Sequence, residues 1–79
     1  MSQRLYDLIA KVMGVPSSNI NDESGPTSIE SWTSFKGYVL LSELETEFNV
    51  KFTIDEAMDI DNVTDIKKYL NNHGVNLDD

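Results

Sequence analysis

The absence of cysteine is the feature that most constrains this chain, because small domains often depend on disulfides or a bound metal for stability. The sequence has 79 residues and no cysteine. A disulfide framework, a thiolate nucleophile and a cysteine-rich zinc site are therefore excluded. A domain of this size buries only about 60–65% of the surface of its unfolded chain. A small apolar core must hold the fold by packing alone.

Apolar residues recur with the period of an α-helix near the start of the chain. The apolar stripe contains Leu5, Leu8, Ile9 and Val12. This spacing predicts a helix over residues 3–13. Gly14 and Pro16 end it, because glycine accepts the left-handed conformation of a helix cap and proline cannot continue the hydrogen-bond ladder.

A long loop is predicted between residues 15 and 33, where Ser, Asn, Asp, Gly and Pro are frequent and no apolar period persists. Loops of this length in a small domain are usually functional or held by their own apolar residues. We expect Ile20, Ile29 and Trp32 to hold it. Thr27 and Glu30 have the spacing of a capping box, which favours a short helical turn inside the loop.

A second long helix is predicted over residues 34–48. Its apolar residues Leu40, Leu44 and Phe48 follow one another at four-residue spacing. Thr33 is the expected N-cap, because its hydroxyl can accept a hydrogen bond from an otherwise unpaired amide of the first turn. Ser34 is then the first helical residue.

Two further helix starts follow. Thr53 and Glu56 form a second capping-box pair, which opens a short helix that ends by Asp59. Asn62 caps a last helix, whose inward stripe is Val63, Ile66, Tyr69 and Leu70 and which ends near Gly74. The sequence therefore predicts an all-α bundle of three main helices and one short helix, in one domain over residues 1–79.

The charge of the chain is strongly negative. It has 14 acidic residues against six Lys and Arg, which gives a net charge of −8. Residues 43–65 contain eight of the acids and one lysine, so this segment holds seven of the eight net negative charges. Such a charge opposes binding to nucleic acid or to an anionic membrane and favours basic protein partners. The longest apolar run is too short for a signal peptide or a membrane span, so we expect a cytoplasmic monomer that does not insert into membranes.

Catalytic and metal-binding constellations are not recognisable in this sequence. A nucleophilic serine needs an oriented base, and the only histidine, His73, lies in a C-terminal N-N-H-G segment. Asp59, Asp61 and Asp65 suggest calcium, but Val63 and Thr64 stand where the EF-hand pattern requires an acid or Asn and a glycine. We therefore expect neither an enzyme nor a metal site.

The segment from Ser28 to Phe48 reads S-I-E-S-W-T-S-F-K-G-Y-V-L-L-S-E-L-E-T-E-F. It resembles the acyl carrier protein family, whose hallmark is Asp-Ser-Leu at the start of the second helix, followed by Leu-x-x-x-Leu-Glu-x-x-Phe. W-T-S-F and then Leu40, Leu44, Glu45 and Phe48 match this pattern. The resemblance continues through the capped helix at Thr53 and N-V-T-D-I-K-K-Y-L, and so covers nearly the whole chain.

The resemblance implies that Ser34 receives a 4′-phosphopantetheine arm from a phosphopantetheinyl transferase. The protein would then carry an acyl or aminoacyl group as a thioester on this arm. A phosphodiester in the first turn of a helix is favoured by free amides and by the positive end of the helix dipole. The alternative is an acidic helical module of similar shape that only binds a basic partner and is never modified.

The resemblance also implies a partner-binding surface. The expected partners are acyl or aminoacyl ligases, transferases or synthases with a basic docking surface. The expected contact residues are Phe35, Tyr38, Val39, Glu43, Glu45, Glu47, Asp55, Glu56 and Asp59. For Phe35 and Tyr38, packing against the long loop is an equal alternative.

Three positions depart from the family pattern. Thr33 replaces the usual Asp, Phe35 replaces the usual Leu, and Lys36 adds a positive charge where partners often meet an acidic or neutral residue. Together with Trp32, these departures indicate a specialised, free-standing carrier of one fatty acid, polyketide or specialised lipid pathway, rather than a housekeeping carrier that serves many enzymes.

Overall fold

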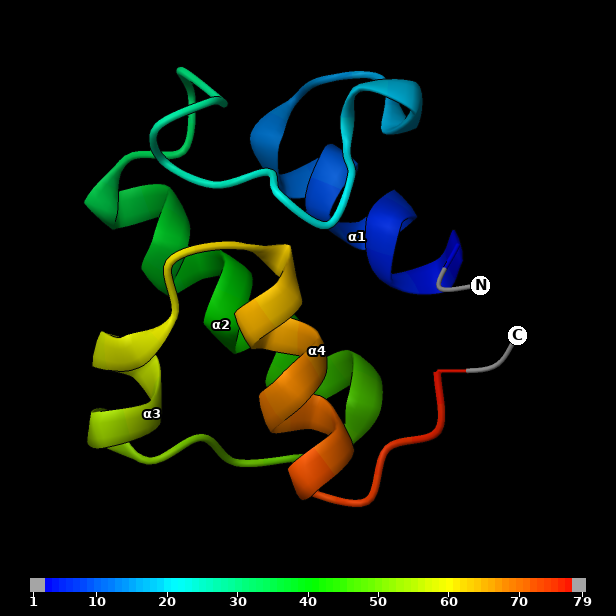
Figure 1. Cartoon of the computed structure of the whole chain (residues 1–79), viewed down its shortest axis with the longest axis vertical. Helices are drawn as coiled ribbons and strands as arrows, with labels where there is room; N and C mark the ends of the chain where they lie inside the picture. Colours follow the sequence, from blue (N-terminus) through cyan, green and yellow to red (C-terminus); the bar gives the residue numbers. More distant parts are fainter. Residues whose placement is uncertain (1–2, 78–79) are drawn as a thin grey trace.

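The computed structural model describes residues 3–77, and this part of the chain contains helices and no strand (Figure 1). The elements in chain order are α1 (Gln3–Met13), the 3-10 turn η1 (Ser17–Asn19), α2 (Ser34–Phe48), α3 (Ile54–Asp59) and α4 (Val63–Asn72). The predicted all-α fold of three longer helices and one short helix is confirmed. The one element that was not predicted is η1.

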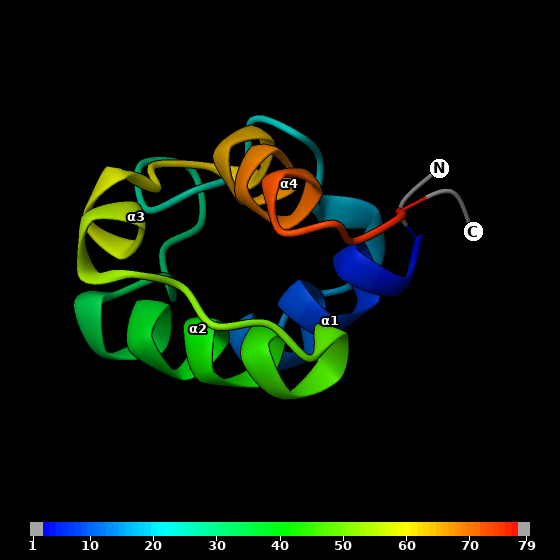
Figure 2. The same cartoon turned by 90° about the horizontal axis from the view of Figure 1, so that it is seen from below.

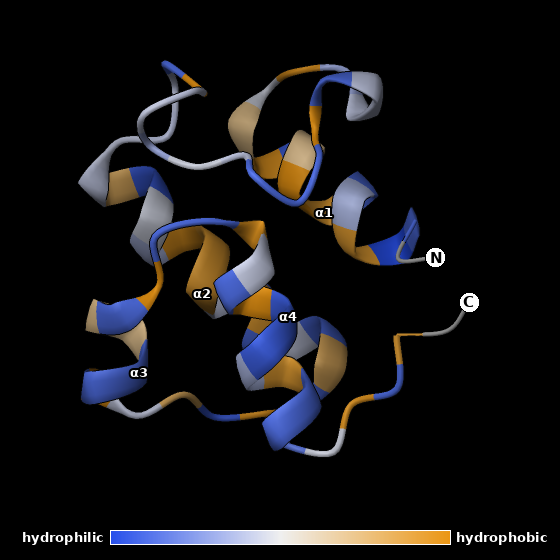
Figure 3. Ribbon diagram, in the orientation of Figure 1, coloured by the Kyte–Doolittle hydropathy of each residue, from blue (hydrophilic) through white to orange (hydrophobic). Residues whose placement is uncertain are grey.

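The helices enclose a single apolar interior. Seen from below, α2 and α1 form the lower side, α4 lies above them, and α3 stands at the end of the molecule away from α1 (Figure 2). The apolar segments of α1, α2 and α4 gather toward the middle (Figure 3). The buried residues are Leu5, Ile9, Ala10, Met13, Ile20, Ile29, Trp32, Leu40, Leu44, Val63, Ile66 and Leu70. None of them lies on α3.

The buried face of α1 is rotated from the predicted stripe. Leu5 and Ile9 are fully buried as expected, but Leu8 and Val12 are only half-buried. Ala10 and Met13 take the remaining inward positions. The rotation follows from the two neighbours of α1, which contacts both α2 and η1 and so buries a wider face than one partner would need.

The long loop is held by its three large apolar residues, as predicted. Ile20, Ile29 and Trp32 are all buried in the core. The loop also contacts the start of α4 through its backbone: the amide of Val63 donates to the Ser24 carbonyl at 3.0 Å, and the amide of Thr64 donates to the Asp22 carbonyl at 2.9 Å. Loop carbonyls therefore satisfy amides that the first turn of a helix cannot pair internally.

The expected helical turn between Thr27 and Glu30 does not form. The turn starts instead at Gly25, whose carbonyl accepts from the amides of Ser28 and Ile29 at 3.1 and 2.9 Å. Gly25 is required at this position, because a Cβ atom there would lie 2.3 Å from the carbonyl oxygen of Asp61. Tertiary contact with the segment before α4 thus overrides the local capping signal.

The C-terminus of α1 receives two side-chain caps from the region around α2. The hydroxyl of Ser31 donates to the Met13 carbonyl at 2.7 Å, and the ammonium of Lys36 donates to the Val12 carbonyl at 2.9 Å. Gly14 follows in the left-handed conformation with φ of 71°. These bonds fix the end of α1 against the start of α2.

Candidate functional site

Thr33 and Ser34 begin α2 in the predicted manner. The Thr33 hydroxyl accepts from the amide of Lys36 at 3.2 Å, and the Thr33 carbonyl accepts from the amide of Gly37 at 2.8 Å. Ser34 is the first helical residue, and it is exposed. Because Thr33 serves as the cap, the Ser34 hydroxyl has no structural task at this helix end.

Two amides beside Ser34 are available to a ligand. Within residues 3–77, no group accepts a hydrogen bond from the amides of Ser34 and Phe35. The positive end of the α2 dipole lies at the same place. These features fit a phosphodiester on the Ser34 oxygen, because its negative charge would meet both the dipole and the free donors.

A cavity of about 470 Å³ opens next to this serine. It lies between the first half of α2, α3, the start of α4 and the end of the long loop. Its wall is formed by Pro26, Trp32, Thr33, Ser34, Gly37, Tyr38, Leu40, Leu41, Ala57, Met58, Ile60 and Ile66. The cavity is thus mostly apolar and can take a hydrocarbon group tethered nearby.

Among residues 3–77, four large apolar side chains are exposed, and all lie on α2 and α3, which border the cavity. Their exposed fractions are 73% for Phe35, 72% for Tyr38, 78% for Ile54 and 79% for Met58. Phe35 and Tyr38 therefore do not pack against the long loop. Val39 is half-buried.

Comparison with known protein families decides the identity of the fold. A family model described as a phosphopantetheine attachment site matches residues 3–70. The chain belongs to the acyl carrier protein family. Carrier domains of this family bear 4′-phosphopantetheine and are not enzymes. No curated protein sequence gives a significant match to the chain.

Most of the acids expected on the docking face of the carrier take part in internal contacts. Glu45 accepts from the amide of Phe52 at 2.9 Å, and Glu47 pairs with the Arg4 guanidinium at 2.7 Å. Glu43 and Asp55 differ: both are exposed, and neither has a hydrogen bond or ion pair with another of the described residues. These two carboxylates are the freest to meet a partner.

Glu56 and His73 connect α3 to the end of α4. Glu56 completes the predicted capping box, because its carboxylate accepts from the Thr53 amide at 2.8 Å, and it also lies 3.0 Å from Nε2 of His73. The hydrogen bond from Thr53, followed by that from His73, holds the pKa of Glu56 below its ordinary value. His73 therefore pairs with a carboxylate on α3 and does not form a triad with a serine.

Asp59 and Tyr69 make a second connection between the same two helices. The phenol of Tyr69 donates to a carboxylate oxygen of Asp59. This hydrogen bond, with nearby negative charge, raises the pKa of Tyr69 to about 12. Tyr69 thus bonds to α3 and is only half-buried, although its spacing predicted an inward position.

Residues 3–77 also bear on membrane insertion and metal binding. No helix there is both long and apolar enough to cross a membrane. No group of three or more His, Asp or Glu side chains in that range could hold a metal ion.

Sequence reasoning had missed Ile54 and Met58 as surface residues, although the Thr53 cap fixes the phase of α3 and hence the direction of both side chains.

Proposed function

We propose that Ser34 is the residue that carries the phosphopantetheine arm, and that the protein presents an acyl or aminoacyl group to successive enzymes as a thioester on that arm. The observation that carries this proposal is the exposed Ser34 hydroxyl on the first residue of α2, beside two unpaired amides and the mouth of the cavity. When bound, the arm supplies the thiol that holds the cargo.

The residues of the chain itself position the arm. The amides of Ser34 and Phe35 and the dipole of α2 stabilise the phosphodiester. Thr33 keeps the helix start closed, so the serine oxygen is free for attachment. Within residues 3–77 no side chain hydrogen-bonds to the Ser34 hydroxyl as a general base would, and the proposal needs none, because the transferase would activate the hydroxyl.

A mass measurement tests this assignment. A broad-specificity phosphopantetheinyl transferase with coenzyme A should convert the protein to one heavier species, and Ser34→Ala should abolish the shift without unfolding the domain. Ser42→Ala is the matched control, because Ser42 is an exposed serine of the same helix. Ser31 is a poorer control, since its hydroxyl caps α1.

Two results would contradict the assignment. Modification that survives in Ser34→Ala would identify another serine as the site. A folded protein that no transferase modifies, including one encoded beside its gene, would favour the alternative of an unmodified module that only binds a basic partner.

We further propose that partners dock across α2 and α3 around Ser34. The exposed Phe35, Tyr38, Ile54 and Met58 offer apolar contact, with Val39 at their edge, and Glu43 and Asp55 offer free carboxylates beside it. Glu45, Glu47, Glu56 and Asp59 add negative charge while making internal contacts. A partner with basic residues around an apolar recess is complementary to this surface.

Charge reversal tests the docking surface. Glu43→Lys with Asp55→Lys should slow modification or acyl transfer by about tenfold at low salt, and the difference should shrink as ionic strength rises. Asp7→Lys with Glu23→Lys is the control, because it changes the net charge equally on α1 and the loop. Equal rates in the two double variants, with both folds verified by circular dichroism, would assign the acids to solubility alone.

A further inference from the structure

The indole of Trp32 brings a polar atom into the apolar wall of the cavity beside Ser34. Trp32 is 6% exposed and lines the cavity together with Ser34 and Gly37. A Cβ atom built on Gly37 would lie 3.7 Å from the indole Nε1 atom. The N–H group therefore lies at the part of the wall where α2 carries no side chain.

This N–H group has no partner in the described part of the protein. No residue among 3–77 accepts a hydrogen bond from it. In the same range, every side-chain nitrogen or oxygen that is sealed from solvent does have a hydrogen-bond partner. The indole nitrogen is therefore not sealed in protein but opens on the space in front of it. A tryptophan N–H is a donor only, and in a buried indole it normally finds an acceptor.

The rest of the cavity wall is mostly apolar, and the hydroxyls of Thr33, Ser34 and Tyr38 that line it do not accept from the indole. Leu40, Leu41, Met58, Ile60 and Ile66 contribute apolar surface. A plain hydrocarbon in this space would remove water from the indole N–H without replacing its hydrogen bond, which is unfavourable. An oxygen atom on the bound group would satisfy it.

We propose that Trp32 selects the cargo of this carrier: the cavity accepts an acyl group that has a carbonyl or hydroxyl oxygen beyond its thioester carbonyl, and the Trp32 N–H donates to that oxygen. This inference rests on the proposed attachment at Ser34. Gly37 contributes by leaving the approach to the indole nitrogen open. A site built to hydrogen-bond its ligand discriminates strongly against an analogue without the polar group.

Nuclear magnetic resonance can read the contact directly, because Trp32 is the one tryptophan of the sequence and gives a single indole resonance. The protein is loaded by a transferase from coenzyme A, octanoyl-CoA, 3-oxooctanoyl-CoA or 5-oxooctanoyl-CoA, and loading is verified by mass. Failure at this step concerns the attachment at Ser34 and not the role of Trp32. The loaded forms are then compared by the indole N–H shift and its hydrogen exchange.

At least one of the oxo-acyl forms should move the indole proton downfield and slow its exchange by about fivefold to tenfold relative to the octanoyl form. Equal behaviour of the oxo-acyl and octanoyl forms would overturn the inference. A full response to the arm alone would also overturn it, because the acceptor would then belong to the arm and not to the cargo.

Two variants separate hydrogen bonding from packing. In the wild type, the responsive oxo-acyl form should melt at a higher temperature than the octanoyl form. Trp32→Phe keeps an aromatic ring but has no donor, and should abolish this difference. Gly37→Ala places a methyl group beside Nε1, and should reduce the difference while the fold is kept. Ser42→Ala, elsewhere on α2, should leave it intact; an undiminished difference in Trp32→Phe would contradict the assignment.

Discussion

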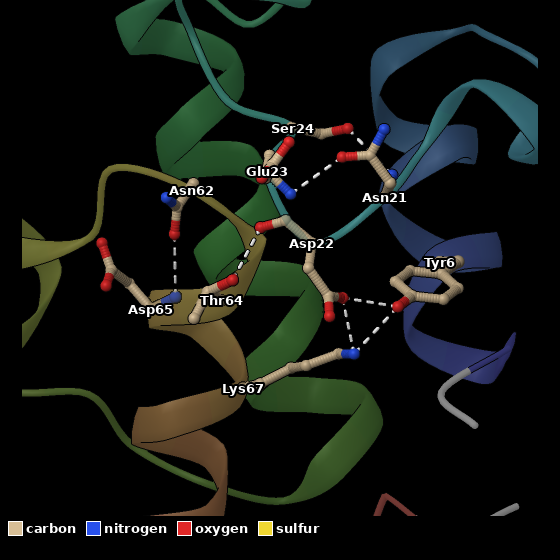
Figure 4. Close-up of polar contacts among 9 residues, drawn as sticks. All are labelled: Tyr6, Asn21, Asp22, Glu23, Ser24, Asn62, Thr64, Asp65 and Lys67. Carbon is tan, nitrogen blue, oxygen red and sulfur yellow. Dashed lines mark hydrogen bonds and ion pairs between the residues drawn. The ribbon is translucent and has the colours of Figure 1, made fainter.

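The long-loop side of the molecule and the α3 side are held in different ways. On the loop side, the carboxylate of Asp22 accepts from the Tyr6 hydroxyl at 2.5 Å and pairs with the Lys67 ammonium at 2.6 Å (Figure 4). The backbone carbonyl of Asp22 accepts from the amide and the hydroxyl of Thr64, both at 2.9 Å. We call residues 21–25 with these partners the clamp. It joins α1, the loop and α4.

The α3 side has few such ties. No residue of α3 is buried, and Ile54 and Met58 are exposed. Its polar contacts lie at its edges, in the capping box and in the bonds to α4 made by Glu56 and Asp59. A region with few buried contacts opens at low free-energy cost. The comparison teaches that the clamp ties α1, the loop and α4 together more firmly than α3 is tied, so the α3 side of the cavity wall is the part that opens most easily.

The strongest test compares one substitution on the two sides. Gly25→Ala should destabilise the protein by about 2–3 kcal/mol, because the added Cβ would lie 2.3 Å from the Asp61 carbonyl oxygen and the clamp backbone must move. Gly37→Ala should stabilise it by up to about 1 kcal/mol, because alanine favours the helix and meets only an ordinary contact at 3.7 Å.

Urea unfolding measures both changes, and opposite signs are the expected result. A Gly25→Ala protein as stable as the wild type would mean that the clamp yields easily, and the contrast between the two sides would be lost.

Removing the Asp22 charge should have a smaller effect. Asp22→Asn should cost about 0.5–1 kcal/mol at neutral pH, because its side chain is half exposed and solvent screens the Lys67 pair. The hydrogen bond from Lys67, then that from Tyr6, lowers the pKa of Asp22. This contribution is therefore present above the ordinary pKa of an aspartate and is lost as pH falls through the lowered value.

Urea titrations of both proteins at neutral and acid pH check this expectation. Asp7→Asn serves as the control, because among the described residues the Asp7 carboxylate accepts only from the Gln3 side chain of its own helix. A deficit in Asp22→Asn that does not diminish in acid would rule out the ionic origin.

A substitution at the edge of α3 should change stability less than Asp22→Asn does. Glu56→Gln should lower the melting temperature slightly at neutral pH, since the carboxylate serves both Thr53 and His73. The pKa of Glu56 is lowered, so its contribution is present above the ordinary glutamate value and disappears as pH falls through the lowered one. Melting curves across this range test the sign, and His73→Gln isolates the share of the imidazole. A growing difference in acid would refute the assignment.

The smallest stability change is expected for the exposed apolar residues of α3. Ile54→Ser with Met58→Ser should alter the free energy of unfolding by no more than about 0.5 kcal/mol, because both side chains lie in solvent. Transfer from the loaded carrier should nevertheless slow if partners dock here. Met58→Leu, which keeps apolar surface, is the control; unchanged transfer in the double serine variant would remove α3 from the docking surface.

Local signals explain why so much of the fold could be predicted. The caps at Thr33, Thr53 and Asn62 each depend on residues three positions away, and all three are observed. Spacing this short is visible in a sequence, and the same phase places Ser34 at the start of α2. The predicted ends at Gly14 and Gly74 likewise coincide with left-handed residues.

Contacts between distant segments explain what could not be predicted. Thr64 bonds to Asp22 across 42 positions, and Lys67 bonds to Tyr6 across 61. Neither pair of residues can be recognised from a short, regular spacing in the sequence. For the same reason the sequence did not reveal the internal partners of the expected docking acids: Glu47 is as solvent-facing as its helical position indicated, yet it pairs with Arg4, near the start of the chain.

The cap that Lys36 provides for Val12 has a consequence for engineering carriers. A simple way to adapt a carrier to another transferase is to replace only the short segment around its modified serine. Here Lys36, two residues after Ser34, also caps the C-terminus of α1. Replacing Lys36 by an acid would set a carboxylate against the carbonyl end of α1, where negative charge is unfavourable. Chimeric carriers built on this chain should therefore exchange α1 and the start of α2 as one unit.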